Sequence, residues 1–358
     1  MRNPRHYDKR GMVKGIPIIS LFSGAGGLDL GFKQAGFNTI LAIDNDPAAY
    51  QTFVSNNPKC DVLRMDLSTM DPKKILDRIT DLPKENYPVG VIGGPPCQAF
   101  SLGNVHKKHD DARSLLPSRY AAHLSVLRKE FDIDFFVFEN VPGLNTRNHG
   151  ALFAELKNLF EDAGFVIQEG VLDALDFGVP QRRQRIFVVG FNRDKYRDIS
   201  FSFPRKLMQA PVTVRDVLAG LPDPVYFSRE LTADKIPFHP NHWCMRPRSA
   251  KFLNGHLTRD GNGNKGRPFR VLDWDAASRT VAYGHREVHV HPSGKRRLSV
   301  YEAMLLQGFP HNYQLFGNLS QQISLVSDAV PPPVGRALAE RIRKSLYAHS
   351  QDNEATAE

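Results

Sequence analysis

The segment GGPPCQAFS, which contains Cys97, is the most chemically suggestive stretch of the sequence. Two glycines and two prolines precede Cys97, and a predicted strand at 89–92 precedes them. The thiol would therefore be held rigidly at the carboxyl end of a strand, where open α/β sheets place their chemistry. The alternative is a buried cysteine that packs as a small hydrophobic side chain. The prolines favour a presented, nucleophilic thiol.

A glycine-rich turn, SGAGGLDLGF, follows the first predicted strand at 16–22. Gly24, Gly26 and Gly27 let the turn pack tightly and let a ligand approach backbone amides at a helix start. Asp44, twenty positions beyond Gly24, ends the second predicted strand and can accept hydrogen bonds from both ribose hydroxyls. NAD enzymes use the same geometry, and a purely structural turn is a further alternative. The pattern alone predicts a nucleotide-like ligand.

Three further groups of polar residues stand next to apolar runs of the sequence. Asp66 comes after the apolar run 62–65, where it could bind an adenine amino group or cap the next helix. Glu139 ends the strand at 135–138, and its ordinary role would be to cap a turn or pair with an arginine. The arginine-rich run 181–185 could be a solvated surface, although its place before an edge strand favours function.

Short runs rich in Ile, Val and Phe alternate with segments of helical period from about residue 16 to 191. This alternation is typical of a parallel sheet covered by helices, so the predicted fold class is α/β. The last two strands are too close together for a crossover helix and should form an antiparallel hairpin at the sheet edge. The predicted strands are 16–22, 39–43, 89–92, 135–138, 166–172 and 186–189.

The texture of the sequence changes after Phe191 to scattered Pro, Gly, His and Arg with little periodicity, which predicts a small loop-rich unit. Helical spacing returns at 298–307 and again at 334–346, where the final helix could rejoin the first unit. The predicted division is a basic tail at 1–15, a catalytic and cofactor-binding domain at 16–191, a recognition domain at 192–297, a return to the catalytic domain at 298–347 and a disordered tail at 348–358.

The net charge of +9 is concentrated in one segment of the chain. Residues 191–297 hold 20 Lys and Arg against 10 Asp and Glu, which gives +10, whereas the remaining 27 against 28 give −1. Lysines and arginines that replace condensed counterions on phosphates gain free energy whatever the base sequence. A nucleic-acid partner for this segment is the natural interpretation, with a merely solvated surface as the alternative.

Composition excludes several other classes of protein. No apolar stretch approaches the ~20 residues that cross a bilayer, and the first residues do not resemble a signal peptide. We therefore expect a cytoplasmic protein. The three cysteines, Cys60, Cys97 and Cys244, have no short spacing that would suggest disulfides or a four-cysteine zinc site. His239, His242 and Cys244 lack a fourth ligand, so no metal is predicted.

Taken in order, these blocks resemble the DNA cytosine-5 methyltransferases of bacterial restriction-modification systems. GGPPCQAFS looks like the signature of that family. Further blocks match from about residue 16 to 345, and as an ordered set they are far more specific than any one alone. They are the cofactor loop with Phe22, Gly24 and Gly26, the acids Asp44 and Asp66, Glu139-Asn140-Val141, the QRRQR run at 181–185, Thr280-Val281, and the stretch from Arg297-Leu298 to Gln307-Gly308-Phe309-Pro310.

The resemblance implies a chemistry that explains these residue types. Carbon 5 of cytosine is too electron-poor to attack a methyl sulfonium until a thiolate, here Cys97, adds to carbon 6. Glu139 would act as the acid at N3, Arg185 would hold the base at O2, and Arg183 would contact a phosphate. The base must be flipped out of the duplex, and the polar segment 101–113 is expected to close over it.

The resemblance also implies the remaining partners. The cofactor is S-adenosylmethionine, the substrate is double-stranded DNA, and a cognate restriction endonuclease is a further expected partner. We expect a monomer that is nucleoid-associated in a bacterial cytoplasm. Expected cofactor contacts beyond those named are Asn45, Leu67, Pro96, Leu116 and Asp328, and expected DNA contacts are Ser101, Gln181 and Thr280.

One block departs from the family pattern, because Asp328 stands where the family usually has an asparagine. Asp328 adds a charge and loses an amide donor, so its cofactor contact is the weakest of those implied. Two rival functions stay open at this point. An RNA cytosine methyltransferase would share the catalytic blocks, but the long basic insert at 191–280 favours DNA read in the major groove. A catalytically idle DNA-binding regulator would not need Cys97, Glu139 and Arg185 together.

Overall fold

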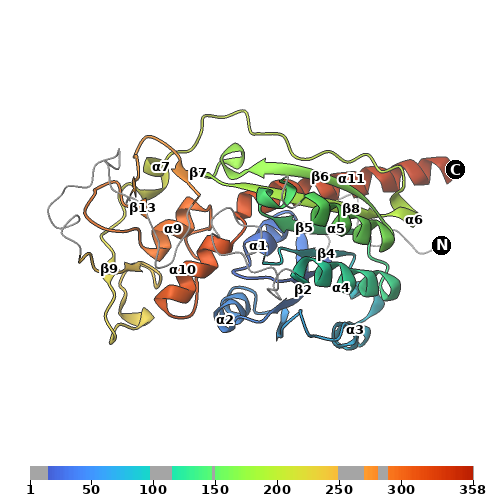
Figure 1. Cartoon of the computed structure of the whole chain (residues 1–358), viewed down its shortest axis with the longest axis horizontal. Helices are drawn as coiled ribbons and strands as arrows, with labels where there is room; N and C mark the ends of the chain where they lie inside the picture. Colours follow the sequence, from blue (N-terminus) through green and yellow to red (C-terminus); the bar gives the residue numbers. More distant parts are fainter. Residues whose placement is uncertain (1–14, 97–114, 147–149, 249–269, 281–288, 358) are drawn as a thin grey trace.

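The computed structural model describes residues 15–96, 115–146, 150–248, 270–280 and 289–357. A seven-stranded sheet of order β3-β2-β1-β4-β5-β8-β6 forms its centre (Figure 1). Strands β1 to β5 run parallel, while β8 runs antiparallel to both β5 and β6. The strands are β1 (Ile16–Leu21), β2 (Phe37–Asp44), β3 (Asp61–Arg64), β4 (Gly90–Gly93), β5 (Phe135–Asn140), β6 (Phe165–Asp173) and β8 (Gln184–Asn192).

The predicted strands and the predicted hairpin are confirmed. β6 and β8 pair antiparallel over nine residues, from Phe165 opposite Asn192 to Asp173 opposite Gln184, and β6 is the edge strand. All six residues of β1 and of β5 are buried. Strands covered on both faces read as continuous apolar runs, which is why the sequence pattern located them.

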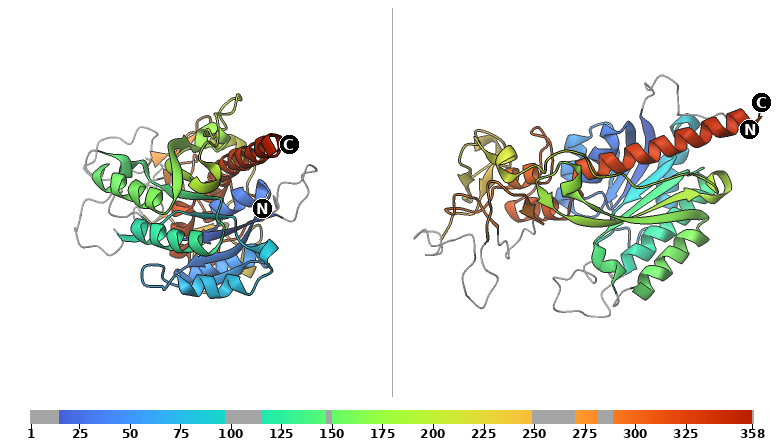
Figure 2. Two further views of the ribbon diagram at one scale, coloured as in Figure 1. Left: turned by 90° about the vertical axis from the view of Figure 1, so that its right-hand side faces the viewer. Right: turned by 90° about the horizontal axis from the view of Figure 1, so that it is seen from above.

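Helices cover both faces of the sheet (Figure 2). On one face α3 (Lys73–Thr80), α4 (Leu116–Glu130) and α5 (Gly150–Asp162) bury Ile75, Tyr120 and Phe160 against the strands. On the other face α1 (Gly27–Gln34) packs against α11 (Pro332–Ala357), so the two ends of the chain share one core. The prediction of a disordered tail from residue 348 is wrong, because α11 continues to Ala357.

Short elements make up the segment predicted to recognise the substrate. Its two-residue strands pair in parallel, β9 with β10 and β11 with β13, while β12 pairs with β7 (Gln181–Arg182) of the preceding domain. The elements of this segment are α6 (Arg193–Tyr196), α7 (Val214–Leu218), β9 (Val225–Tyr226), η5 (Ala233–Lys235), β10 (Trp243–Cys244), β11 (Arg270–Val271), β12 (Ser278–Arg279) and β13 (His289–Val290). The preceding domain also contains the short 3-10 helices η1 (Lys84–Asn86), η3 (Pro142–Asn145) and η4 (Ala174–Phe177).

Helices α9 (Val300–Leu306) and α10 (Leu319–Asp328) join this segment to the sheet domain. α9 packs against α7 and Leu272, whereas a second cluster joins α9 and α10 to Ala48 at the start of α2 (Pro47–Asn56) and to Trp243. Both helices begin with a capping box, Ser299 with Glu302 and Asn318 with Gln321. The boundary between the catalytic domain and the recognition domain stays a prediction, because α9 contacts both of them.

Candidate active site

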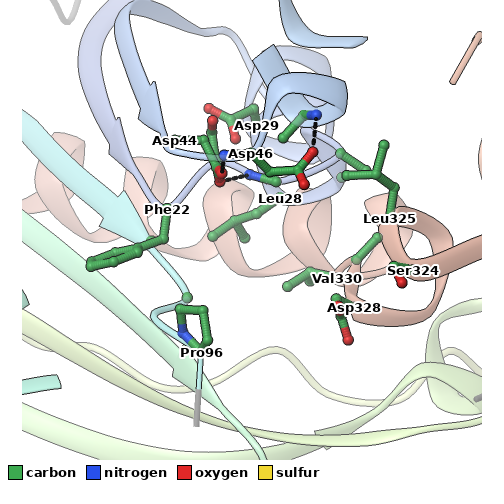
Figure 3. Close-up of a pocket in the computed structure, with 18 of the residues that line it drawn as sticks. Phe22, Leu28, Asp29, Asp44, Asp46, Pro96, Ser324, Leu325, Asp328 and Val330 are labelled. Atoms are coloured by element: carbon green, nitrogen blue, oxygen red, sulfur yellow. Dashed lines mark hydrogen bonds between the residues drawn. The ribbon is translucent and has the colours of Figure 1, made fainter. Parts of the chain in front are cut away.

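A cavity of about 460 Å³ opens at the carboxyl ends of β1, β2, β4 and β5. This is the edge at which open α/β sheets bind their ligands. Figure 3 shows Asp328 and Ser324 of α10 across the cavity from Phe22 and Pro96. The structure brings seven of the predicted site residues to its lining: Phe22, Gly24, Asp44, Asn45, Pro96, Glu139 and Asp328.

The glycine turn forms one wall of the cavity through unusual backbone geometry. Phe22 has a φ of 56°, in the left-handed region that non-glycine residues rarely adopt. A side chain at Gly27 would place its Cβ 2.2 Å from the carbonyl oxygen of Val330, and one at Gly26 would meet the Tyr313 hydroxyl at 2.8 Å. At Gly24, φ is 53° and an added Cβ would meet no atom within 4 Å, so that side of the turn is open to a ligand. Backbone strain of this kind clusters at functional sites. The left-handed φ of Phe22 therefore supports a ligand-binding role for the turn.

Asp44, the last residue of the neighbouring strand β2, binds the backbone of the glycine turn. Its carboxylate accepts hydrogen bonds from the backbone N–H of Gly24 at 2.8 Å and of Asp46 at 2.9 Å. Burial raises the pKa of Asp44, while these hydrogen bonds oppose the shift. Each carboxylate oxygen accepts one of these two hydrogen bonds, and a carboxylate oxygen has further capacity to accept from a ribose hydroxyl. The residues therefore fit a nucleoside bound against the glycine turn.

Two acids of the site were missed by the sequence analysis. Asp46 caps α2 by accepting from the N–H groups of Ala48 and Ala49 at 2.7 and 2.8 Å, and the Asp-Pro pair at a helix start was the available signal. Asp29 lies in the cavity floor, where the hydroxyls of Ser20 and Thr39 donate to it at 3.0 and 2.9 Å. Burial raises the pKa of Asp29 to about 6.

The serines on the face of α10 that lines the cavity were also missed, whereas Asp328 of the same face was predicted from the resemblance. Ser320, Ser324 and Asp328 recur at a spacing of four residues and so lie on one side of the helix. They stand some 300 positions from the glycine turn, and no local pattern links the two segments. Burial raises the pKa of the Asp328 carboxyl, an effect that the charges of Arg183 and Arg185 oppose.

Glu139 and Arg185 form an ion pair at the cavity. Glu139 ends β5, is 7% exposed, and its Oε1 lies 3.0 Å from Nε of Arg185. A Cβ at Gly94 would lie 2.4 Å from Oε2 of Glu139, so the second glycine of GGPPC makes room for this carboxyl group. Burial raises the pKa of Glu139, although the guanidinium groups of Arg185 and Arg183 favour its charged form. Such a group can hold a proton in a site that also contains a fixed cation.

Asn140, the last residue of β5, also positions the segment that leads to Cys97. Asn140 donates its side-chain N–H to the carbonyl oxygen of Pro95 at 3.2 Å, and Pro96 lines the cavity. The next residue is Cys97, so the chain enters the cysteine segment at the cavity. Cys97 itself and Ser101 lie outside the described residues, as does the predicted closing segment 101–113.

The prediction that Arg183 contacts a phosphate is wrong for this structure. The side chain is 1% exposed, and its Nη2 donates to the backbone oxygens of Ser327 at 2.6 Å and Ala329 at 3.0 Å. Arg183 therefore ties the arginine run to the end of α10 and fixes the backbone on both sides of Asp328.

Three predicted residues make their described contacts inside the protein. Gln181 is 0% exposed and donates to the Leu306 oxygen at 3.5 Å, so its predicted DNA contact is wrong for this structure. Leu67 and Leu116 are buried and do not line the cavity, and their predicted cofactor contacts stay predictions. Gly26 shapes the turn behind the cavity without lining it.

Two other predicted residues are exposed. The Asp66 carboxylate accepts from the N–H of Ser68 at 2.8 Å, and hydrogen bonds from the hydroxyl and the N–H of Ser68 lower its pKa. It lies outside the cavity lining, and its contact with adenine stays a prediction. The Thr280 hydroxyl donates to the Arg182 oxygen at 2.8 Å, so it links two strands and remains accessible at the surface.

Comparison with known proteins decides the family. The pattern of the C-5 cytosine-specific DNA methylases matches residues 16–344, nearly the whole chain. The chain belongs to the C-5 cytosine-specific DNA methylases. It is therefore an enzyme that methylates cytosine in DNA at carbon 5.

Relatives and solved structures agree with this placement. The methylase is 34% identical to the Type II methyltransferase M.MthTI of Methanothermobacter thermautotrophicus over 92% of this chain and 98% of the relative. It is 31% identical to the Type II methyltransferase M.NgoPII of Neisseria gonorrhoeae over 92% and 96%. The crystal structure of an E. coli prophage protein assigned as a DNA modification methyltransferase superposes with a TM-score of 0.75 at 24% identity, over 93% and 99%. The predicted methyltransferase fold is confirmed.

Within the described residues of the methylase, no helix has the length and apolar character that crossing a membrane requires.

Proposed function

We propose that the methylase transfers a methyl group from S-adenosylmethionine to a cytosine flipped out of a specific double-stranded DNA sequence, with Cys97 as nucleophile. The observation that carries this proposal is the ion pair of Arg185 with Glu139, because Glu139 lines the same cavity as the glycine turn. S-adenosylmethionine, when bound, supplies an electrophilic methyl group. The residues that would hold it are the open backbone at Gly24, the Asp44 carboxylate and the α10 face.

The chain's own residues prepare the cytosine for reaction. The Cys97 thiolate adds to carbon 6 and pushes an electron pair toward N3, which makes carbon 5 nucleophilic. Glu139 donates a proton to N3, and its raised pKa keeps that proton available at higher pH than for an ordinary glutamate. Arg185 donates to O2 and counters the charge that develops there. Once carbon 5 is methylated, loss of its proton expels the thiolate.

The other two cysteines are poor candidates for the nucleophile. Burial raises the pKa of Cys60 and of Cys244, in each case to about 12. A thiol with such a pKa holds almost no thiolate at neutral pH, and the thiolate is the reactive form. This leaves Cys97, which follows the cavity-lining Pro96.

Covalent trapping tests the proposal. Plasmid DNA that contains 5-fluorodeoxycytidine is incubated with the methylase and S-adenosylmethionine, because fluorine at carbon 5 blocks the last elimination. We expect a cofactor-dependent protein–DNA band that survives SDS, is lost in Cys97→Ser, and persists in Cys60→Ser and Cys244→Ser. Trapping by Cys97→Ser would refute the assigned nucleophile. Methyl transfer to tRNA in place of DNA would refute the substrate.

The names of the relatives support a proposal about the partner and the location of the methylase. Several of them carry names of Type II methyltransferases. We infer that the methylase acts with a cognate endonuclease of the same target site, as a monomer, in association with the nucleoid. Plasmid DNA recovered from a strain that expresses the methylase should resist that endonuclease, and elution of the free protein as a dimer in size-exclusion chromatography with light scattering would contradict the monomer.

A further inference from the structure

The two-stranded pair β7–β12 joins the sheet domain to the segment that follows it in the chain. β7 directly precedes β8, while β12 comes from the basic segment 192–297, about a hundred residues later (Figure 1). In this parallel pair Gln181 stands beside Ser278 and Arg182 beside Arg279. Two further bonds hold the register, from the N–H of Ser278 to the Pro180 oxygen and from the Thr280 hydroxyl to the Arg182 oxygen, both 2.8 Å.

The pair has one buried face and one exposed face. Gln181 and Ser278 are 0% and 2% exposed, and they point into the protein. Arg182 and Arg279 follow them by one position, so their side chains leave the opposite face, and both are exposed. Neighbouring strands lie about 4.8 Å apart, which places the two arginine side chains next to each other.

Two like charges side by side on a sheet are destabilising unless an anion offsets them. Within the described parts of the chain, neither the Arg182 nor the Arg279 guanidinium forms an ion pair or a side-chain hydrogen bond. The same short run contains two arginines with internal partners: Arg183 donates to Ser327 and Ala329, and Arg185 pairs with Glu139. Arg182 is thus the arginine of the run that the fold directs toward solvent.

The position of the pair relates it to the active site. Arg182 precedes Arg185, the partner of the cavity residue Glu139, by three positions, a span of roughly 10 Å in extended chain. Guanidinium groups suit phosphate because their planar donors bind two oxygens at once. An anion held here would lie close to the cavity and would touch both the sheet domain and the basic segment.

We propose that Arg182 and Arg279 together bind one backbone phosphate of the DNA strand that carries the target cytosine. The inference rests on the proposed function and assigns to Arg182 the phosphate contact that the buried Arg183 does not make. The shared phosphate sets the distance between the recognising segment and the cavity, because one arginine comes from each. It therefore positions the target base before the base enters the cavity.

Salt dependence of DNA binding provides the first test. Binding to a duplex of about 30 base pairs is measured by fluorescence anisotropy over a range of KCl concentrations, for the wild type, Arg182→Gln, Arg279→Gln and the double variant. One lost phosphate contact lowers the slope of log K against log [salt] by about 0.9. Because the two arginines share a phosphate, we expect the double variant to lose about 0.9 and not about 1.8.

A matched control separates local contact from overall charge. Arg197 belongs to the basic segment but is exposed at the end of α6, whose Tyr196 packs into the core of the sheet domain, and Arg197→Gln removes the same charge. We expect its slope to equal that of the wild type. An equal loss in Arg197→Gln, an unchanged slope in the double variant, or a loss of about 1.8 would each overturn the inference.

A second measurement locates the phosphate. Single methylphosphonate linkages, which are uncharged, replace the phosphates around the target cytosine one at a time. We expect one linkage at which the wild type loses affinity and the double variant loses none. Equal losses for both proteins at every linkage would contradict the shared contact. If the wild type binds but methylates no DNA, the proposed function fails, whereas unchanged variants of an active wild type overturn only this inference.

Discussion

Glu139 shares its cavity with a second carboxyl group, that of Asp328. Burial is the main cause that raises the pKa of Glu139, and the negative charge of Asp328 adds to the effect. Arg185 and Arg183 act in the opposite direction and favour the ionised form of both acids. The protonation of Glu139 at a given pH therefore depends on Asp328, the position at which this chain departs from the usual asparagine of the family.

The substitution Asp328→Asn tests this dependence. Removing the negative charge lowers the pKa of Glu139, so Glu139 loses its proton at a lower pH. If protonated Glu139 is the acid at N3, activity falls as pH rises through that pKa. We expect the alkaline limb of the profile of kcat against pH, measured by transfer of a tritiated methyl group, to move to lower pH. An unmoved limb, or one moved to higher pH, would refute the coupling.

Arg183 makes a structural contact that can be distinguished from DNA binding. In Arg183→Leu the backbone oxygens of Ser327 and Ala329 lose a buried donor. We expect the free energy of unfolding in urea to fall by about 1–3 kcal/mol for the unsatisfied group. The salt slope of DNA binding should not change. A lowered slope with full stability would instead support a phosphate contact.

At the scale of elements, α9 depends on a buried ion pair. Glu302 is 0% exposed, both its oxygens lie 2.9 Å from the guanidinium of Arg296, and Oε2 also accepts from the N–H of Ser299 at 2.7 Å. The carboxylate thus caps the helix and neutralises an arginine from the preceding segment. This contact fixes α9 to the chain that leads out of the basic segment.

Loss of the ion pair between Glu302 and Arg296 should lower the stability of the fold. We expect Glu302→Ala to lower the free energy of unfolding by about 3–5 kcal/mol, because the buried Arg296 then keeps only the exposed carboxylate of Asp223, at 3.1 Å, as an ion-pair partner among the described residues. Glu340→Ala is the control, since Glu340 pairs with Arg336 at 2.8 Å on the exposed side of α11. That change should cost less than about 1 kcal/mol. Similar costs for the two variants in urea denaturation would contradict the role assigned to Glu302.

The helices and strands show how much of the fold could be predicted from the sequence. Strands buried on both faces, such as β1 and β5, read as apolar runs, and the antiparallel β6–β8 pair followed from a connection too short for a crossover helix. The serines of the α10 face could not be found, because they look like part of an ordinary polar helix until the tertiary fold places them, with Asp328, opposite Phe22.

The arginine run 181–185 also shows what could not be predicted from the sequence. Arg182, Arg183 and Arg185 are equivalent in sequence, yet one is exposed, one is buried and one pairs with Glu139. Their directions are set by the break between β7 and β8 and by the pairing of β7 with a strand from the distant basic segment. No local periodicity contains that information.

At the scale of the whole molecule, the cavity is built from both ends of the chain. The glycine turn and Asp44 come from the first fifty residues, and α10 comes from the last forty. A ligand that contacts both walls must stabilise the entire fold, because unfolding either wall releases it. At one hundred times its Kd, such a ligand adds about 2.7 kcal/mol to the free energy of unfolding.

Thermal unfolding measures this linkage. We expect S-adenosylmethionine to raise the Tm of the wild type, and to raise it much less in Asp44→Ala, which loses the acceptor at the glycine turn. Asp71→Asn, at an acid that lies outside the cavity lining, is the control and should respond as the wild type does. A full rise in Asp44→Ala would contradict the assigned binding site.

Bisulfite sequencing of genomic DNA, from a methylation-free bacterial host that expresses the chain, tests the central claim most directly. The claim is that the enzyme methylates carbon 5 of cytosine within one DNA sequence by means of Cys97 and Glu139. We predict protected cytosines in one short sequence context with the wild type, and none with Cys97→Ala or Glu139→Gln. Equal protection in the Cys97→Ala strain, or no protection with soluble wild-type protein, would contradict the account.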